Sequence, residues 1–441
     1  MDFKLPGSKL AATAAVLCFC AGGARAQTFT KSSYMRAVFA ASPELKSAEE
    51  SVRIADNSYF STLIETSLPS LSLTAGAPLY GFSDLGGWEG ARLNRNEVSS
   101  SAQADWNLFN SGRDMLALKS ARYSKDIAEL QLKQLRQGLA LSALSTYYNL
   151  LLKYKLLDVA RGNLRDQESQ NAIAKSLYEN GLQKLTDMLQ SDTDLRSSQL
   201  RLAQADADYQ NALVNFNSAI DRDPLSDCHL DETLNISSAP LPSPERDTAK
   251  ALAQRYEILQ AEINFKSSQN SYKRTLLDNL PEFRVDAFWS KNGLVTFGLP
   301  GSGAVPDPDY GVTAALNIPI GFFWQSQKSK VSSAMSAQRQ TANALESGRR
   351  SVRGEVVSSR VALNLQQRSL DLAEFKTKIA KQKLELIQEQ YRQGATDSIH
   401  LTQAQSDYLD SQNQYTNALY QTVLNTAQYK KSLGEPLWEM P

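Results

Sequence analysis

Side chains that commonly perform catalysis are scarce in this chain. It contains 2 histidines in 441 residues, and one of them, His229, directly follows Cys228. An adjacent thiol and imidazole could act as nucleophile and base. The pair lies in a proline-rich segment, however, and no third residue nearby in the sequence would orient the imidazole. We therefore expect Cys228 to be a neutral surface thiol and the protein not to be an enzyme.

Sequence patterns for other chemical sites are also missing. No glycine-rich phosphate loop follows a predicted strand, and no cysteine or histidine spacing matches a metal site. The sequence lacks methionine or histidine clusters, which argues against copper handling. We expect no cofactor and no bound metal, so the function must come from the architecture of the chain.

The N-terminus has the pattern of a secretory signal. Lys4 and Lys9 precede an apolar run over residues 10–22, and small residues follow at 24–26. We expect residues 1–26 to be a signal peptide that is removed on export. Lys and Arg together number 47, as do Asp and Glu, so no overall charge attracts nucleic acid. No later apolar run reaches the roughly 18 residues of a membrane helix, whereas alternating membrane strands remain compatible with this composition.

An internal duplication is the most informative pattern. The motif Tyr-x-x-Gly at 178–181 recurs 213 positions later at 391–394, and the Leu-Pro pair at 68–69 recurs at 280–281. Further residues match at the same 213-residue offset: Gln190 with Gln403, and Asp194 with Asp407. A unit repeated on this scale buries its apolar faces against its twin or against other copies. We assign the chain to three mature parts: repeat 1 at 27–223, a linker at 224–245 and repeat 2 at 246–441.

Each repeat is predicted to contain a helix, two strands and a long helical hairpin. The first helices are expected at about 32–66 and 246–279, and the hairpins turn at Gly181 and Gly394. Without a proline from 111 to 179, the first hairpin arm would be about 100 Å long. Alternating residues predict the strands, at about 68–80, 98–109, 281–291 and 310–322.

The predicted strands have two different faces. Ala102, Ala104 and Trp106 alternate with Gln103 and Asp105, for example. Such strands could form half-buried hairpins of a soluble protein or tilted strands of a membrane barrel. Four equivalent strands in an exported, duplicated chain favour the membrane.

Four strands are too few to close a barrel, since the smallest membrane barrels have eight. Open edges are excluded from hydrocarbon because each unpaired backbone group costs several kcal/mol. Two copies of the chain would give eight strands around a filled interior, whereas three would give twelve strands and a pore. We favour three. The expected fold class is mainly α with membrane β, in which a duplicated protomer with four strands and long coiled-coil helices forms a trimer.

Several short motifs resemble the TolC family of outer-membrane efflux channels. The segment 42–48 resembles its Pro-x-Leu-x-x-Ala helix opening, 68–73 its helix-to-strand junction, and the two Tyr-x-x-Gly motifs its hairpin tips. The resemblance implies a homotrimer with a 12-stranded barrel in contact with outer-membrane lipid and an α-helical tunnel in the periplasm. It also implies a passive exit channel of a tripartite efflux pump or type I secretion system. Such a channel works with a periplasmic adaptor (membrane fusion protein) and an inner-membrane pump of the RND, ABC or a similar class.

The resemblance also suggests gate and constriction residues. Asp187 matches a tip aspartate that helps to lock the closed state, and Tyr391 matches its tyrosine partner. Thr396 stands where the family's best-studied member has an arginine, so that closing salt bridge cannot form as such. His400 and Gln403 replace aspartates that narrow the tunnel mouth of that member. The acidic gate is therefore altered in this chain.

Adaptor docking is expected at the tip residues Gly181, Leu182, Gly394 and Ala395, again by resemblance. Two gate candidates have structural alternatives. Asp187 could simply stabilise a helix start. His400 could be satisfied between neighbouring helices, or three copies could form a ring that protonation opens, since an isolated imidazole titrates near about 6.5.

The competing function is a soluble periplasmic coiled-coil scaffold or adaptor. Such a protein would share the signal, the balanced charge and the heptads of this chain. It would not need strands with an apolar outward face, and it would leave a membrane with salt rather than with detergent.

Overall fold

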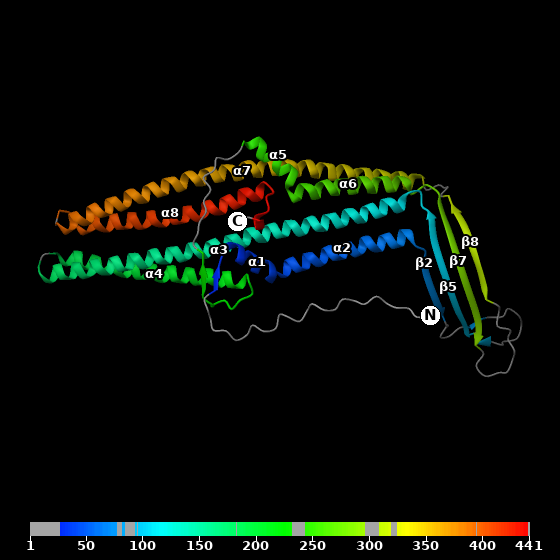
Figure 1. Ribbon diagram of the computed structural model, residues 1–441, viewed down its shortest axis with the longest axis horizontal. Helices are drawn as coiled ribbons and strands as arrows, with labels where there is room; N and C mark the ends of the chain where they lie inside the picture. The colour runs from blue at the N-terminus through cyan, green and yellow to red at the C-terminus, as the bar shows by residue number, and fades with distance from the viewer. Residues whose placement is uncertain are drawn as a thin grey trace.

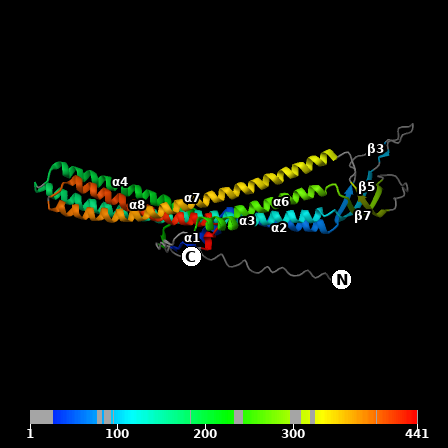
Figure 2. The same ribbon diagram turned by 90° about the horizontal axis from the view of Figure 1, so that it is seen from above.

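The computed structural model describes residues 27–76, 82–83, 93–94, 96–181, 183–231, 243–295, 308–318, 324–393 and 395–439. The predicted signal peptide, residues 1–26, lies outside these ranges. The described chain is a long bundle of helices. A β-sheet lies at one end, and the turns of two helical hairpins lie at the other (Figures 1 and 2). No helix in these ranges combines the length and apolar character needed to cross a membrane.

A four-stranded antiparallel sheet forms one end of the molecule. Its strand order is β2-β5-β7-β8. The strands are β2 Ser70–Gly76, β5 Asn96–Phe109, β7 Glu282–Val295 and β8 Asp309–Asn317. A small ribbon of β3 Phe82–Ser83 and β4 Leu93–Asn94 lies in a segment expected to be loop. Each repeat therefore supplies two neighbouring strands, and the prediction of four strands per chain is confirmed.

The strand register separates the residues of the sheet into two faces. On one face Leu71 lies opposite Ala104, and Ala104 lies opposite Ala287. On the other face Asp105 lies between Ser70 and Asp286 in the same way. Large side chains on the apolar face are strongly exposed, with Leu71 at 82%, Leu73 at 87%, Tyr310 at 76% and Val312 at 73%. One face is thus apolar and uncovered, and the other is polar.

Two long helical hairpins turn at the end opposite the sheet; the first arm of each begins near the sheet, and the second arm returns only to the middle of the molecule (Figure 1). The first consists of α3 Arg113–Glu179 and α4 Leu185–Ser218, and the second of α7 Trp324–Arg392 and α8 Ser398–Ser432. The 67 residues of α3 correspond to about 100 Å of helix, as its proline-free sequence predicts. Because arms of this length show repeated apolar seams, each hairpin packs as a coiled coil.

The predicted first helix of each repeat is broken into two. Ser42 has extended backbone, and its side chain accepts a hydrogen bond from the Leu45 amide, so α1 Lys31–Ala41 ends and α2 Pro43–Ser67 begins there. In the second repeat Arg255 is extended and separates α5 Pro244–Gln254 from α6 Tyr256–Leu277. The start of α2 agrees with the expectation that Pro43 lies near a helix start, whereas the break at Arg255 was not expected and is fixed by an ion pair of a non-helical residue.

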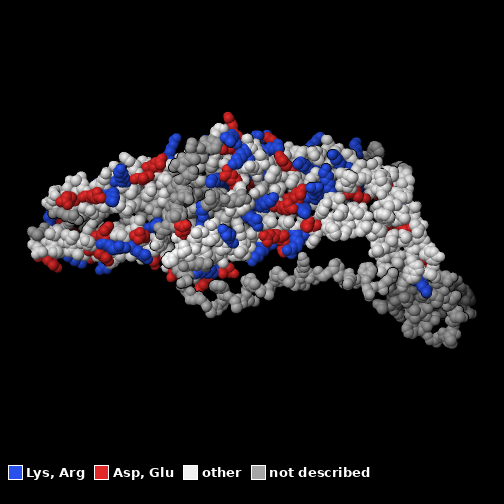
Figure 3. Space-filling view, in the orientation of Figure 1, with Lys and Arg blue, Asp and Glu red and all other residues white. Residues whose placement is uncertain are grey.

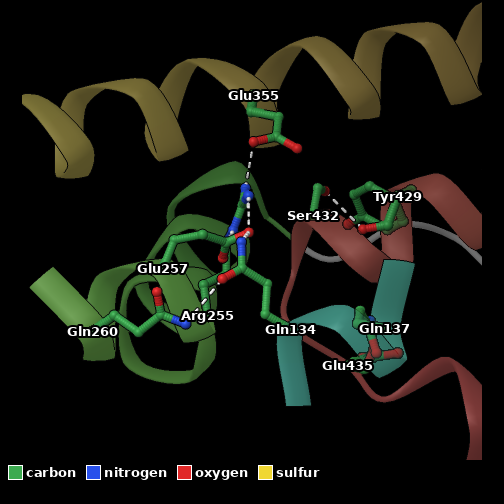
Figure 4. Close-up of polar contacts among 9 residues, drawn as sticks. All are labelled: Gln134, Gln137, Arg255, Glu257, Gln260, Glu355, Tyr429, Ser432 and Glu435. Atoms are coloured by element: carbon green, nitrogen blue, oxygen red, sulfur yellow. Dashed lines mark hydrogen bonds and ion pairs between the residues drawn. The ribbon is translucent and has the colours of Figure 1, made fainter. Parts of the chain in front are cut away.

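The Arg255 break is stabilised by a polar network, which Figure 4 shows. The Arg255 guanidinium, of which 7% is exposed, pairs with Glu257 at 3.2 Å and with Glu355 of α7 at 2.6 Å. Nearby, the Gln137 side chain of α3 holds the chain end after α8. It donates to the Glu435 carbonyl at 2.5 Å and accepts from the Leu437 amide at 3.2 Å. The second repeat is thereby tied to α3 of the first.

An aromatic core lies at the middle of the molecule. The rings of Tyr34 and Phe216 stack with centroids 4.0 Å apart, and both side chains are fully buried. The Tyr147 hydroxyl donates to the carbonyls of Phe29 at 3.1 Å and Asp231 at 2.9 Å, and burial raises the pKa of this phenol. This core anchors β1 Gln27–Phe29, which pairs in parallel with β6 Cys228–Leu230. The segment expected to be an irregular linker thus contributes a strand.

Candidate channel gate at the hairpin tips

The turns of the two hairpins lie at the same end of the molecule (Figure 1). Gly181 ends the first arm with a positive φ of 72°, which a glycine adopts without steric cost. In the second turn Asp397 caps α8, because its carboxylate accepts from the His400 amide at 3.0 Å. The predicted tip residues Leu182 and Gly394 lie outside the described residues. Helix ends of both repeats are therefore brought together here.

Among the described residues of the tip region, four side-chain hydrogen bonds connect the two hairpins, and we call them the tip ladder. Each joins a residue of the first hairpin or its turn to one of the second. They are Gln183 Nε2 to Tyr391 Oη at 2.8 Å, Ser398 Oγ to Asp187 Oδ1 at 3.4 Å, Thr402 Oγ1 to Asp194 Oδ2 at 3.1 Å, and Gln167 Nε2 to Gln405 Oε1 at 2.9 Å. The contact between the hairpins near the tips thus depends on individual polar bonds.

A cleft of about 550 Å³ separates the hairpins along the ladder. Apolar side chains from both sides line it, including Ile173 and Leu384, together with the carboxylates of Asp187, Asp194 and Glu385. An incompletely filled boundary loses dispersion contacts along its walls. Each bridging hydrogen bond contributes only about 0.5–1.5 kcal/mol net. The boundary between the hairpins is therefore only partly filled here and is bridged by single polar bonds.

The two main gate candidates both belong to the tip ladder. Asp187 accepts from Ser398, and the Tyr391 hydroxyl accepts from Gln183, so each reaches the opposite hairpin. Their partners were missed by the sequence reasoning. Gln183 could have been identified by its position in the sequence, because it lies two residues after Gly181, the last residue of the first Tyr-x-x-Gly motif.

The internal repeat predicts one further contact of the tip region. Gln190 donates to Asp194 at 2.9 Å, and the equivalent Gln403 donates to Asp407 at 2.7 Å. Hydrogen bonds from Lys383 and then Gln403 lower the pKa of the Asp407 carboxyl. Gln403, a constriction candidate, is therefore engaged within its own hairpin.

The remaining candidates lie in the second turn. The His400 side chain is 70% exposed, and its Nδ1 lies 2.6 Å from Asp397 Oδ1. Hydrogen bonds from the His400 backbone and ring lower the pKa of Asp397. The His400 ring thus contacts the cap of its own helix, and a ring of His400 residues from three copies stays a prediction. Thr396 is half-buried, while Ala395 is exposed and donates from its amide to the Gln390 carbonyl at 2.8 Å.

The adjacent cysteine and histidine are successive residues of strand β6, so their side chains point to opposite faces. Cys228 is half-buried in β6, and burial raises its pKa to about 11, so the thiol is neutral near pH 7. It is not the surface residue that the sequence suggested. Across the described ranges, no group of three His, Cys, Asp or Glu residues could hold a metal ion.

Comparison with known proteins identifies the architecture. A sequence profile of the family described as outer membrane efflux protein matches residues 35–221 and 248–435, one match in each repeat. No curated protein sequence matches this chain. Among solved structures, the outer-membrane channel OprN has a TM-score of 0.78 at 18% identity and covers 92% of this chain and 90% of its own. CusC, a protein studied for its folding and transmembrane channel formation, has a TM-score of 0.77 at 16% identity, and the match covers 92% of this chain and 92% of CusC. The Campylobacter jejuni outer membrane channel CmeC has a TM-score of 0.77 at 15% identity and covers 92% of this chain and 85% of its own. The resemblance noted in the sequence is thereby confirmed, and this chain belongs to the outer membrane efflux protein family.

Proposed function

We propose that three copies of this chain join their sheets into one barrel and serve as the exit channel of a tripartite pump in the outer membrane. The single observation that carries the proposal is the four-stranded sheet with two different faces and two unpaired edge strands. Its apolar side chains, such as Leu71, Leu73 and Val312, are more than 70% exposed in the single chain. Lipid would cover them, and neighbouring copies would pair with the outer edges of β2 and β8.

The polar face would then line the pore. Asp105 and Asp286 lie side by side on this face, with Arg284 and Gln103 one step away on the same two strands. Charged and polar side chains are well solvated in a water-filled pore, whereas their transfer into the hydrocarbon of a membrane costs free energy. The helices would continue the duct away from the membrane into the periplasm, with the hairpin tips at its far end.

The tip ladder is proposed as the lock of the closed channel. Separating α7–α8 from α3–α4 would break the bonds of Tyr391, Asp187 and Thr402 and widen the end of the duct. The cleft of about 550 Å³ along this boundary would let whole hairpins move apart. The proposal assigns the chain no catalysis, because the work of transport would come from the pump.

The tips also offer the surface at which an adaptor would dock. We assign this role to Gly181, Leu182, Gly394 and Ala395, as the family resemblance suggests. The inner-membrane pump would then deliver solutes or proteins through the adaptor. A type I secretion system would use the same duct with a different pump.

Membrane extraction and conductance test the proposed function together. The exported full-length chain should resist salt extraction, dissolve in detergent as a species of three copies, and conduct ions in a planar lipid bilayer. A soluble scaffold would leave the membrane with salt and would not conduct. A salt-extracted monomer without conductance would refute the channel and favour that alternative.

A further inference from the structure

The cleft between the two hairpins has the size and the walls of a small-molecule site. Its volume is about 550 Å³, and all four hairpin helices, α3, α4, α7 and α8, line it. Ligand pockets in proteins commonly have about 300–1,000 Å³, with apolar walls and a few polar groups that fix orientation. Ile173 and Leu177 supply apolar wall from the first hairpin, and Leu384 and Leu401 supply it from the second. A molecule in this cleft would therefore contact both hairpins at once.

The charged groups of the cleft select a positively charged molecule. Its carboxylates are those of Asp166, Asp187, Asp194 and Glu385, whereas Lys381 is the one basic residue among the described residues that line it. The lining therefore carries an excess of three negative charges. Figure 3 shows acidic side chains on both hairpins, on either side of the hollow near the tips.

Two of these carboxylates are half-buried, and their charge is not compensated. Asp187 accepts from the Ser398 hydroxyl at 3.4 Å, and Asp194 accepts from the Thr402 hydroxyl at 3.1 Å and from the Gln190 amide at 2.9 Å. These donors are neutral, and no basic side chain in the described part of the chain forms an ion pair with either carboxylate. A cation in the cleft would supply the missing charge, and the partly desolvated surroundings would strengthen the attraction.

The walls favour an organic cation over a metal ion or a helix. The rings of Tyr391 and Tyr408 line the cleft, and the face of a tyrosine ring attracts a cation within about 6 Å. No group of three His, Cys, Asp or Glu residues in the described ranges could hold a metal ion. At a helix diameter of about 10 Å, the cleft would hold only about 7 Å of helix, little more than one turn.

We propose that this cleft binds an amphipathic organic cation and that the bound cation holds the two hairpins together. A protonated amine would lie between the carboxylates of Asp187 and Asp194, and an aromatic or branched apolar body would lie against Ile173 and Leu384. Charge complementarity thus selects the amine, and the apolar walls select the body that carries it.

Binding would favour the arrangement in which the tip ladder is intact. The two walls belong to different hairpins, so the site is lost when the hairpins separate, and a ligand shifts an equilibrium by its differential affinity for the two states. At about 100 times its dissociation constant, a cation that binds only joined hairpins shifts the ratio of joined to separated hairpins by roughly a hundredfold. The site depends on the geometry of one chain, whereas its effect on the gate rests on the proposed channel function.

A fluorescence titration of the full-length chain in detergent tests the site. The probe is 9-aminoacridine, a flat aromatic cation, and acridine-9-carboxylate is the matched anion. We expect saturable binding of the cation and at least tenfold weaker binding of the anion. Asp187→Asn combined with Asp194→Asn should weaken binding of the cation at least tenfold, because the amides keep the shape of the carboxylates and remove two charges.

The control removes the same charge elsewhere on the same helices. Asp206→Asn combined with Asp410→Asn changes exposed residues of α4 and α8 outside the cleft and should leave the affinity unchanged. Equal binding of the cation and the anion, or an equal loss of affinity in both double variants, overturns the proposal.

Photolabelling locates the site without any substitution. An aryl azide derivative of 9-aminoacridine is bound to the wild-type chain and activated by light, and labelled peptides are identified by mass spectrometry. We expect labels within residues 166–177 of α3 and 381–391 of α7, which excess 9-aminoacridine should suppress. Labels confined to other segments overturn the site, even where a double variant folds poorly.

Single-channel recording separates this inference from the proposed channel. Saturating 9-aminoacridine should lower the open probability of the wild-type channel at least tenfold. Binding in the cleft without this change, or a voltage-dependent block that persists in the double variant of Asp187 and Asp194, refutes the effect on the hairpins while the channel stands. A wild-type chain that does not conduct refutes the channel, and the titration and photolabelling still decide the site.

Discussion

Removing the Tyr391 hydroxyl should favour the open state of the channel. Tyr391→Phe keeps the ring at the tip but eliminates the 2.8 Å hydrogen bond with Gln183 across the hairpins. A net contribution of about 1 kcal/mol for such a bond corresponds to roughly a fivefold shift if one hairpin moves alone. If three copies open together, the sum of about 3 kcal/mol shifts the closed-to-open ratio by roughly a hundredfold.

Single-channel recording in planar bilayers would measure this shift as open probability, and sensitivity of cells to a large antibiotic would report it in the envelope. Tyr178→Phe is the matched control, because it is the equivalent tyrosine of the first repeat and the tip ladder does not include it. The reasoning is refuted if Tyr391→Phe closes as completely as wild type, or if the control opens the channel equally.

Four further predictions concern stability and pH. Phe216→Ala should lower the free energy of unfolding by about 3–5 kcal/mol, measured by urea titration, because it empties the centre of the aromatic core. Gly434→Ala should lower the free energy of unfolding, because the φ of Gly434 is 80° and the added Cβ would lie 3.0 Å from backbone atoms. Gly138→Ala should stabilise α3 by up to about 1 kcal/mol in the same titration, because no atom lies within 4 Å of the added Cβ. The Lys383 ammonium holds the pKa of the Asp407 carboxyl below its usual value. The ion pair should therefore persist as pH falls to the usual aspartate pKa and be lost only as pH falls through the lowered pKa of Asp407, which NMR of the carboxyl group would follow.

Much of this fold could be predicted because the helices and strands of both repeats follow periodic patterns of apolar and polar residues. Alternation gives the two faces of β5, and the absence of proline gives the length of α3. Pro43 indicated the start of α2, but the break at Arg255 was harder, because it depends on one residue whose side chain finds a partner in the folded state. A pattern averaged over many residues does not register such a partner.

The tip region with the gate candidates was predictable as a place but not as a set of contacts. The duplicated tip motif indicated that Tyr391 and Asp187 lie near helix turns. Their partners Gln183 and Ser398 depend on how one hairpin is turned against the other, and that orientation has no signature in the local sequence. The His400 contact with Asp397 is a helix cap, and its spacing of three residues was visible in the sequence but not interpreted.

The pairing of β1 with β6 constrains the order in which this protein can mature. Phe29 lies beside Leu230 across some two hundred residues of intervening chain. Bringing such distant segments together costs loop-closure entropy before any contact compensates for it. The leading segment must therefore wait until the whole first repeat has emerged from the secretion machinery, with its aromatic side chain exposed to chaperones and proteases meanwhile. The pairing of β1 with β6 can then form only after about half of the chain has emerged, and it marks the first repeat as finished.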